Sequence, residues 1–233
     1  YTMYKNLLSW LTVLVLFPSC SKTPPNISVV CEENNVGNCI IKWETAPLIH
    51  GQVEVYASAN PELIPETMPI AAAPISEGKM VIVTDDPSRR YYYTMVFNNK
   101  YRVTVATRNI NIPGIQNFRD LGGYRSSTTG KNVRWGMLYR SAQIDSLGCA
   151  ARRELRNMGI RTIIDLRTPE ELNNYPQIQK GFNVVHIPIA TGNMEKVLQG
   201  IQEGKIKGDT INRIVERMNR ELVINYRDEY KKL

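Results

Sequence analysis

The sequence predicts an all-β sandwich at residues 27–108 followed by an α/β domain at residues 109–233. In the first segment, short runs rich in Val, Ile, Tyr and Thr are separated by turn-forming residues, and no helix-length periodic run interrupts them. In the second segment, strand-like and helical patterns alternate along the chain. The length of 233 residues suits one large or two ordinary domains, and the hydrophobic content of 42% is typical of a globular protein.

The first 20 residues have the composition of an export signal. Lys5 precedes a largely apolar run at residues 7–17, and Cys20 follows. The run is shorter than the ~20 residues of a membrane-spanning helix. A cysteine directly after the cleavage point resembles the bacterial lipoprotein signal, which implies lipidation of Cys20, export to the periplasm or outer surface, and membrane contact through the lipid anchor. An uncleaved anchor with an incidental cysteine is the alternative, and residues 21–26 have the composition of a linker.

Several runs carry the strand signal of the first segment. They read ISVVC, CIIKW, QVEVYA, KMVIV, YYYTMVF and YRVTVAT. About six or seven short strands in such a length predict an antiparallel sandwich. Trp43 in an early strand, and Tyr91 to Tyr93 near the penultimate one, resemble the core aromatics of fibronectin type III and other immunoglobulin-like modules. We therefore expect an immunoglobulin-like sandwich.

The cysteines are interpreted through the expected export. Disulfides persist outside the cytoplasm, and Cys31 and Cys39 flank the turn-rich segment EENNVGN between two strand-like runs. We expect a disulfide between them, worth ~2 to 3 kcal/mol by the loop-entropy estimate. Cys149 then has no partner.

The formal net charge is +7, with Lys/Arg-rich stretches near residues 151–161 and 213–232. Such stretches are ordinary solvated faces or attract anionic substrates and lipid surfaces. Nucleic acid is not an expected partner, because the aromatic-basic interleaving of a binding module is missing. No cysteine or histidine cluster has metal-ligand spacing, so we expect neither a metal nor another cofactor.

The second segment has helices with identifiable ends. After the strand MLYR, Asp145 or Ser146 can cap a helix that runs to Met158, and Gly159 can end it in a left-handed conformation. Its apolar face comprises Leu147, Ala151, Leu155 and Met158.

A capping box follows the buried strand RTIIDL. Thr168 is the predicted N-cap, Pro169 the first helical residue and Glu171 the reciprocal partner. The strand NVVHIPI, a helix at residues 194–202 and a long helix from about residue 210 complete the pattern. Apolar positions of the long helix are Ile211, Ile214, Met218, Leu222, Tyr226 and Tyr230.

Three segments place an arginine at a strand end or loop, which is where α/β domains build their sites. They are NFRDLGGY at 117–124, GMLYRSA at 136–142 and IIDLRTPEE at 163–171. Arg119, Arg140 and Arg167 could converge on a phosphate, because a guanidinium fork matches it bidentately. Asp120 and Asp165 could position those arginines or transfer protons. Alternatively, each Arg–Asp pair is an ion pair that fixes a loop.

The order of these segments, with a helix ending in MGI before IIDLR, resembles the bacterial tyrosine phosphatase family from about Ile112 onward. That family includes atypical secreted enzymes that also accept phosphoserine or phosphoinositides. The resemblance implies a cysteine-dependent phosphatase fold, no metal, a phosphocysteine intermediate, and phosphorylated protein or phosphoinositide as substrate. It carries over Arg119, Asp120, Asp165 and Arg167 as residues beside the catalytic pocket, and Arg140 is a candidate for substrate binding.

The nucleophile of this chemistry is absent from the 233 residues. A loop of the form His-Cys-x5-Arg cradles the phosphate at a helix N-terminus. Residues six positions after the four cysteines are Asn26, Gly37, Thr45 and Leu155, and none is arginine. Cys149 is followed by arginines at other spacings and lies in a predicted helix, so it is not the expected nucleophile.

We therefore expect an incomplete phosphatase domain, an amino-terminal portion of a longer product, that is inactive by itself. A pseudophosphatase is the alternative. The rival function is a non-catalytic surface lipoprotein that binds a glycan, a protein or a phosphorylated ligand.

Overall fold

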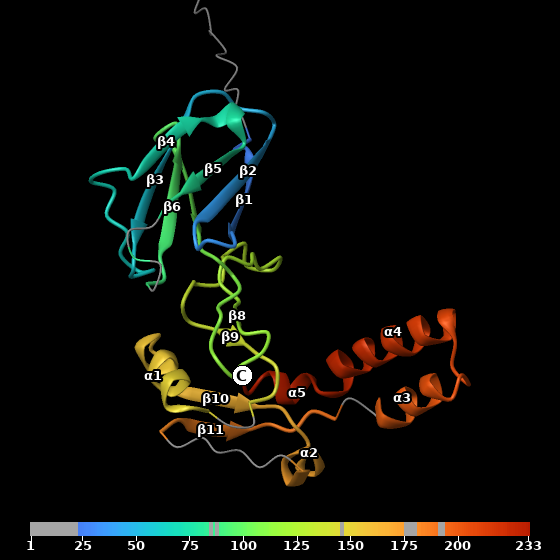
Figure 1. Ribbon diagram of the computed structural model, residues 1–233. Helices are drawn as coiled ribbons and strands as arrows, with labels where there is room; N and C mark the ends of the chain where they lie inside the picture. Colours follow the sequence, from blue (N-terminus) through green and yellow to red (C-terminus); the bar gives the residue numbers. More distant parts are fainter. Residues whose placement is uncertain (1–22, 84–85, 87–88, 145–146, 175–180, 191–193) are drawn as a thin grey trace, which may run out of the picture.

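The chain forms a β-sandwich followed by a second region of mixed strands and helices (Figure 1). The computed structural model describes residues 23–83, 86, 89–144, 147–174, 181–190 and 194–233. The predicted export signal and Cys20 lie outside the described residues. None of the described helices is long and apolar enough to cross a bilayer.

Two antiparallel sheets make up the sandwich, with strand orders β1-β2-β5 and β4-β3-β6-β7. The predicted runs coincide with strands, and β4 was not predicted. The assignment to the immunoglobulin-like class remains a prediction. The strands are β1 (Asn26–Glu33), β2 (Cys39–Ala46), β3 (Gln52–Ser58), β4 (Ala71–Pro74), β5 (Lys79–Ile82), β6 (Tyr92–Phe97) and β7 (Tyr101–Val105), with a short 3-10 turn η1 (Ile75–Glu77) before β5.

Aromatic and β-branched side chains from both sheets form the core of the sandwich. Trp43 packs edge-on against Phe97, with ring centroids 6.4 Å apart, and its Nε1 donates to the Ile75 carbonyl at 2.7 Å. The indole is thus buried with its polar atom satisfied. All six residues of β6 are buried, so this strand is covered on both faces.

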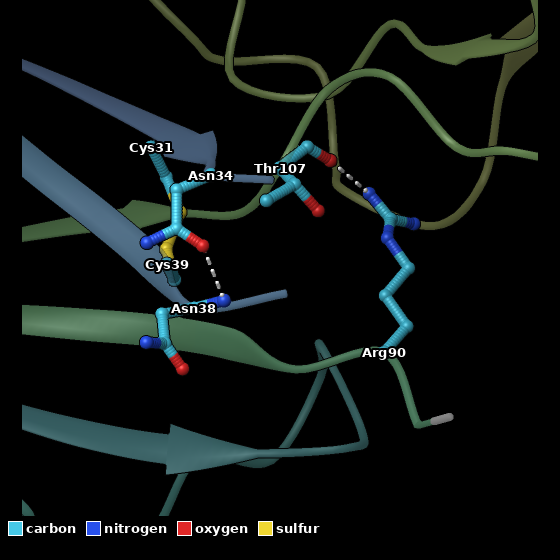
Figure 2. The surroundings of a disulfide bond; sticks show 6 residues. All are labelled: Cys31, Asn34, Asn38, Cys39, Arg90 and Thr107. Atoms are coloured by element: carbon cyan, nitrogen blue, oxygen red, sulfur yellow. Dashed lines mark hydrogen bonds between the residues drawn. A yellow bond between two sulfur atoms is a disulfide. The ribbon is translucent and has the colours of Figure 1, made fainter. Parts of the chain in front are cut away.

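The predicted disulfide between Cys31 and Cys39 is present and links β1 to β2 beside their connecting turn (Figure 2). In that turn the side-chain oxygen of Asn34 accepts from the backbone of Val36 at 3.0 Å and of Asn38 at 2.9 Å. An asparagine that replaces backbone acceptors in this way stabilises a tight turn.

The second region contains two small sheets and several helices. β8 (Arg119–Asp120) and β9 (Tyr139–Arg140) are antiparallel, whereas β10 (Thr162–Asp165) and β11 (Asn183–His186) are parallel. The predicted α/β alternation after residue 140 agrees with this order. The helices are α1 (Cys149–Asn157), α2 (Pro169–Asn174), α3 (Met194–Gln202), α4 (Gly208–Asn225) and α5 (Arg227–Tyr230).

Helix α1 begins later than the sequence predicted. Its N-cap is Gly148, whose extended backbone (φ −63°, ψ 161°) precedes Cys149; the proposed caps Asp145 and Ser146 lie outside the described residues. Its end is as predicted: Gly159 has φ 79°, and paired hydrogen bonds close a Schellman motif. Leu147, Ala151 and Leu155 are buried in the second core, with Met158 packed against it.

The capping box of α2 is confirmed. The Thr168 backbone N–H donates to the Glu171 carboxylate at 2.7 Å, and the Glu171 N–H donates to the Thr168 hydroxyl at 3.3 Å. The long helix differs from its prediction, because Tyr226 (φ −110°) separates α4 from α5. No residue of α4 is buried.

Candidate functional site

Two of the predicted arginines face each other on the β8–β9 ladder. Arg119 pairs directly with Arg140, and directly opposite residues of an antiparallel pair project from the same face. Arg119 is half-buried and Arg140 is exposed. The Arg119 Nη2 donates to the Asn117 side chain, while its Nε is buried without an acceptor among the described residues. The ladder therefore places the two arginines opposite each other on one face of the sheet.

Asp120 is directed away from this face and is completely buried. Its Oδ1 accepts from the Gly122 N–H at 2.7 Å, and its Oδ2 accepts from the Gly136 N–H at 2.9 Å. The same Oδ2 lies 2.8 Å from Arg90 Nη1. Asp120 thus fixes the backbone after β8 and before β9. No part of the carboxylate is exposed, and the assignment of Asp120 as a pocket-lining residue stays a prediction.

Arg90 lies just before β6 and connects the sandwich to the NFRDLGGY segment through its ion pair with Asp120. Its Nη1 also donates to the Tyr92 hydroxyl at 2.8 Å and to the Tyr139 hydroxyl at 3.4 Å. Its Nη2 donates to the Thr107 carbonyl at 3.0 Å, a contact that Figure 2 shows near the disulfide. Burial raises the pKa of Tyr139, so this hydroxyl stays neutral over the physiological range.

The two adjacent glycines of the NFRDLGGY segment, Gly122 and Gly123, allow the Trp135 side chain to pack closely against the backbone. A Cβ added to Gly122 would lie 2.5 Å from the Trp135 Cα. Gly123 has φ +77°, and a Cβ added to it would lie 2.7 Å from an atom of the indole ring. Trp135 in turn packs into the sandwich core, where its Nε1 donates to the Thr104 carbonyl at 3.0 Å. Trp135 therefore connects the NFRDLGGY segment to the sandwich core.

The third predicted segment forms a separate pair. Asp165, at the end of β10, is buried and lies 3.1 Å from Arg167 Nε, and it also accepts from the Arg167 backbone. The His186 ring nitrogen lies 2.6 Å from the Arg167 carbonyl oxygen. Asp165 thus pairs with Arg167, and its role beside a catalytic pocket stays a prediction. The structure brings Arg119 and Arg140 together, and it holds the Arg167 side chain on Asp165.

Cys149 is an exposed free thiol at the first turn of α1, in the predicted helix and not in a loop. It borders an open cavity of about 540 Å³ on α1. The other lining residues are Arg152, Arg153, Arg156, Asn157 and Gly181. Among the described residues, no group of His, Cys, Asp or Glu could hold a metal ion.

Sequence reasoning missed the residues that support the motif. Arg90 is one of two adjacent arginines before a tyrosine-rich strand, a pattern without specific meaning. Arg108 donates to the Asp120 carbonyl at 2.8 Å, and its guanidinium lies 4.1 Å from the Tyr124 ring centroid and 5.1 Å from that of Trp135. The glycine pair was a usable signal for Trp135, since adjacent glycines often mark close packing.

A family model described as "Tyrosine phosphatase family" matches residues 110–233, more than half of the chain. The chain belongs to the tyrosine phosphatase family. This confirms the family that the motifs predicted, and the matched segment contains Arg119, Arg140 and Arg167.

Solved structures share much weaker likenesses. Pectate lyase Pel3 from Pectobacterium carotovorum is 16% identical over 38% of this chain and 28% of that chain, with a TM-score of 0.29. The β-glucuronidase of Ruminococcus gnavus in complex with uronic isofagomine is 12% identical over 69% of this chain and 28% of that chain, with a TM-score of 0.25. Such scores support no statement about function. The comparison with curated proteins gives no match.

Proposed function

We propose that this chain provides the phosphate-recognition part of a protein-tyrosine phosphatase, with Arg119 and Arg140 as the donors to the phosphate. The observation that carries this proposal is their direct opposition on one face of the β8–β9 ladder. Like charges placed opposite each other destabilise a sheet. A bound oxyanion removes that penalty, because each guanidinium can donate two parallel hydrogen bonds to it.

The buried Arg119 Nε supports the same assignment. It is a charged donor without an acceptor among the described residues, and such groups are costly unless a partner completes them. The half-buried position also reduces solvent screening around Arg119. Phosphotyrosine is the first substrate that we propose, and phosphoserine and phosphoinositides are further members of the class.

For the chemical step we propose the phosphocysteine route of the family. The 233 residues contain no cysteine with an arginine six positions later, and Cys149 begins a helix in place of a cradle. We therefore expect these residues to bind phosphate without hydrolysing it. We also propose an exported, lipid-anchored protein, on the basis of the apolar leader before Cys20; the absence of acyl label on Cys20 would overturn the anchor.

The binding claim is tested by titrating O-phospho-L-tyrosine into the chain and into Arg119→Ala and Arg140→Ala variants by calorimetry. Hydrogen bonds to charged groups contribute about 1.5–3 kcal/mol, so each variant should bind at least about tenfold more weakly. Arg217→Ala is the matched control, since it removes one exposed guanidinium on α4. Equal affinity in all four proteins would contradict the proposal.

A non-catalytic lipoprotein that binds a phosphorylated ligand, a glycan or a protein is the second candidate. It is favoured by the engagement of Asp120 with Arg90 and of Asp165 with Arg167, which leaves neither carboxylate as a free proton donor. Turnover of p-nitrophenyl phosphate that is lost in Cys149→Ser would overturn this candidate and our expectation of inactivity together.

A further inference from the structure

We propose that Arg90 of the sandwich is a positioning residue for the phosphate site, because it holds Asp120 and thereby the two strands that carry Arg119 and Arg140. The inference rests on the proposed function of those two arginines. It assigns the sandwich a part in substrate recognition in addition to any role as a spacer.

Asp120 provides the first link between Arg90 and the two strands that carry Arg119 and Arg140. Its two carboxylate oxygens bind the backbone of Gly122, just after β8, and of Gly136, just before β9. A single buried side chain therefore fixes the distance between the two strands. Since Asp120 follows Arg119 directly in β8, a displacement of the Asp120 backbone moves the Arg119 backbone as well.

The ion pair between Arg90 and Asp120 provides the second link, from the two strands to the sandwich. The two groups lie 2.8 Å apart, and the carboxylate is completely buried. An ionised carboxylate without a cation is strongly disfavoured in such an environment, so it becomes protonated or moves toward water. Arg108 is the other cation beside Asp120, but it donates to the backbone carbonyl and not to the carboxylate.

The sandwich in turn fixes Arg90. The guanidinium lies 4.7 Å from the Tyr92 ring centroid and donates to the Tyr92 hydroxyl and the Thr107 carbonyl. Tyr92 belongs to the fully buried strand β6, and Thr107 follows β7. Arg90 therefore connects the β8–β9 ladder, which carries Arg119 and Arg140, to the buried strand β6 of the sandwich.

The test measures the affinity of the whole chain for O-phospho-L-tyrosine by calorimetry, with thermal unfolding recorded for every variant. Arg90→Met should weaken binding at least tenfold, and Arg90→Lys, which keeps the charge, should lose less. The double variant Arg90→Met with Asp120→Asn removes both charges and should recover part of the affinity, because the asparagine oxygen can still accept from one of the two backbone N–H groups. A purely structural loss of packing would not be rescued in this way.

Arg102→Met is the matched control, because Arg102 is a sandwich arginine whose carboxylate partner is Glu66 on the surface. It should leave the affinity unchanged. If Arg119→Ala weakens binding but Arg90→Met does not, the inference is wrong and the proposed function stands. If Arg119→Ala has no effect, the proposed function itself fails. Should Arg90→Met not fold, the double variant decides: affinity as weak as that of Arg119→Ala overturns the inference.

Discussion

Strands β6 and β11 are both predicted from apolar runs, yet their environments are opposite. All six residues of β6 are buried, whereas all four of β11 are exposed, with Val184 and Val185 at 40% and 38%. β6 lies between β3 and β7 in a sheet that packs against a second sheet, whereas β11 pairs only with β10 in the described part of the chain. An apolar run therefore predicts a strand, and the surrounding layers decide how well it is buried.

The same contrast explains how the candidate site is supported. Arg119 and Arg140 lie on strands of two residues each, which have few hydrogen bonds of their own. Their stability comes from Asp120, Trp135 and the sandwich behind them. We therefore expect the sandwich to unfold last, and the phosphate site to depend on it.

The largest effect is expected for Trp135→Ala, which removes the side chain that joins the two regions. Loss of a buried tryptophan costs about 3–5 kcal/mol, because a cavity remains where the ring was. Denaturant unfolding followed by circular dichroism should show this loss, together with weaker phosphotyrosine binding. A loss below 1 kcal/mol would show that the junction is not a packed interface.

Removal of the disulfide tests whether the sandwich and the second region unfold separately, because the bond lies within the sandwich. The double variant Cys31→Ala and Cys39→Ala should lower the free energy of unfolding of the sandwich by about 2.5 kcal/mol, on the loop-entropy estimate. Hydrogen exchange should report this change in β1 and β2 and leave the amides of β10 and β11 unaffected. Equal acceleration in both regions would instead indicate a single cooperative unit.

Gly122→Ala tests the close approach of Trp135 to the motif. The added Cβ would lie 2.5 Å from a backbone atom, which cannot move away at low cost. Overpacking of this kind costs about 1–3 kcal/mol. Gly148→Ala is the matched control, since no atom lies within 4 Å of its added Cβ. Two variants with equal melting temperatures would contradict the observed packing.

The smallest effect is expected for Thr168→Ala, in the second region only. Loss of the N-cap hydroxyl costs about 1 kcal/mol of local stability. Hydrogen exchange should increase in the amides of α2, while those of the sandwich keep their protection. A change in the sandwich would show that the two regions are more tightly coupled than the junction contacts indicate.

Local chemistry made several elements predictable from the sequence. The β-branched and aromatic runs of the sandwich, the capping box at Thr168 and the left-handed Gly159 each depend on neighbouring residues. Strand β4 was missed because its sequence, AAAP, has little β-propensity and is held by pairing with β3. Helix α1 begins late because Gly148 is extended.

The candidate site was only partly predictable. The motifs indicated Arg119, Arg140 and the Asp165–Arg167 pair, because these residues lie in recognisable segments. The ion pair between Arg90 and Asp120 joins two distant parts of the chain, and neither periodicity nor spacing contains such a contact. Burial of Asp120 likewise arises from tertiary contacts, among them its pairing with Tyr139 on the β8–β9 ladder.

The central claim is that Arg119 and Arg140 hold one phosphate between them. The most direct measurement is a crystal structure of the whole chain with tungstate, whose strong scattering locates the oxyanion. We predict density bridging the two guanidinium groups on the β8–β9 ladder. Tungstate bound only at the arginines of α1, with Arg119 and Arg140 uncontacted, would contradict the account.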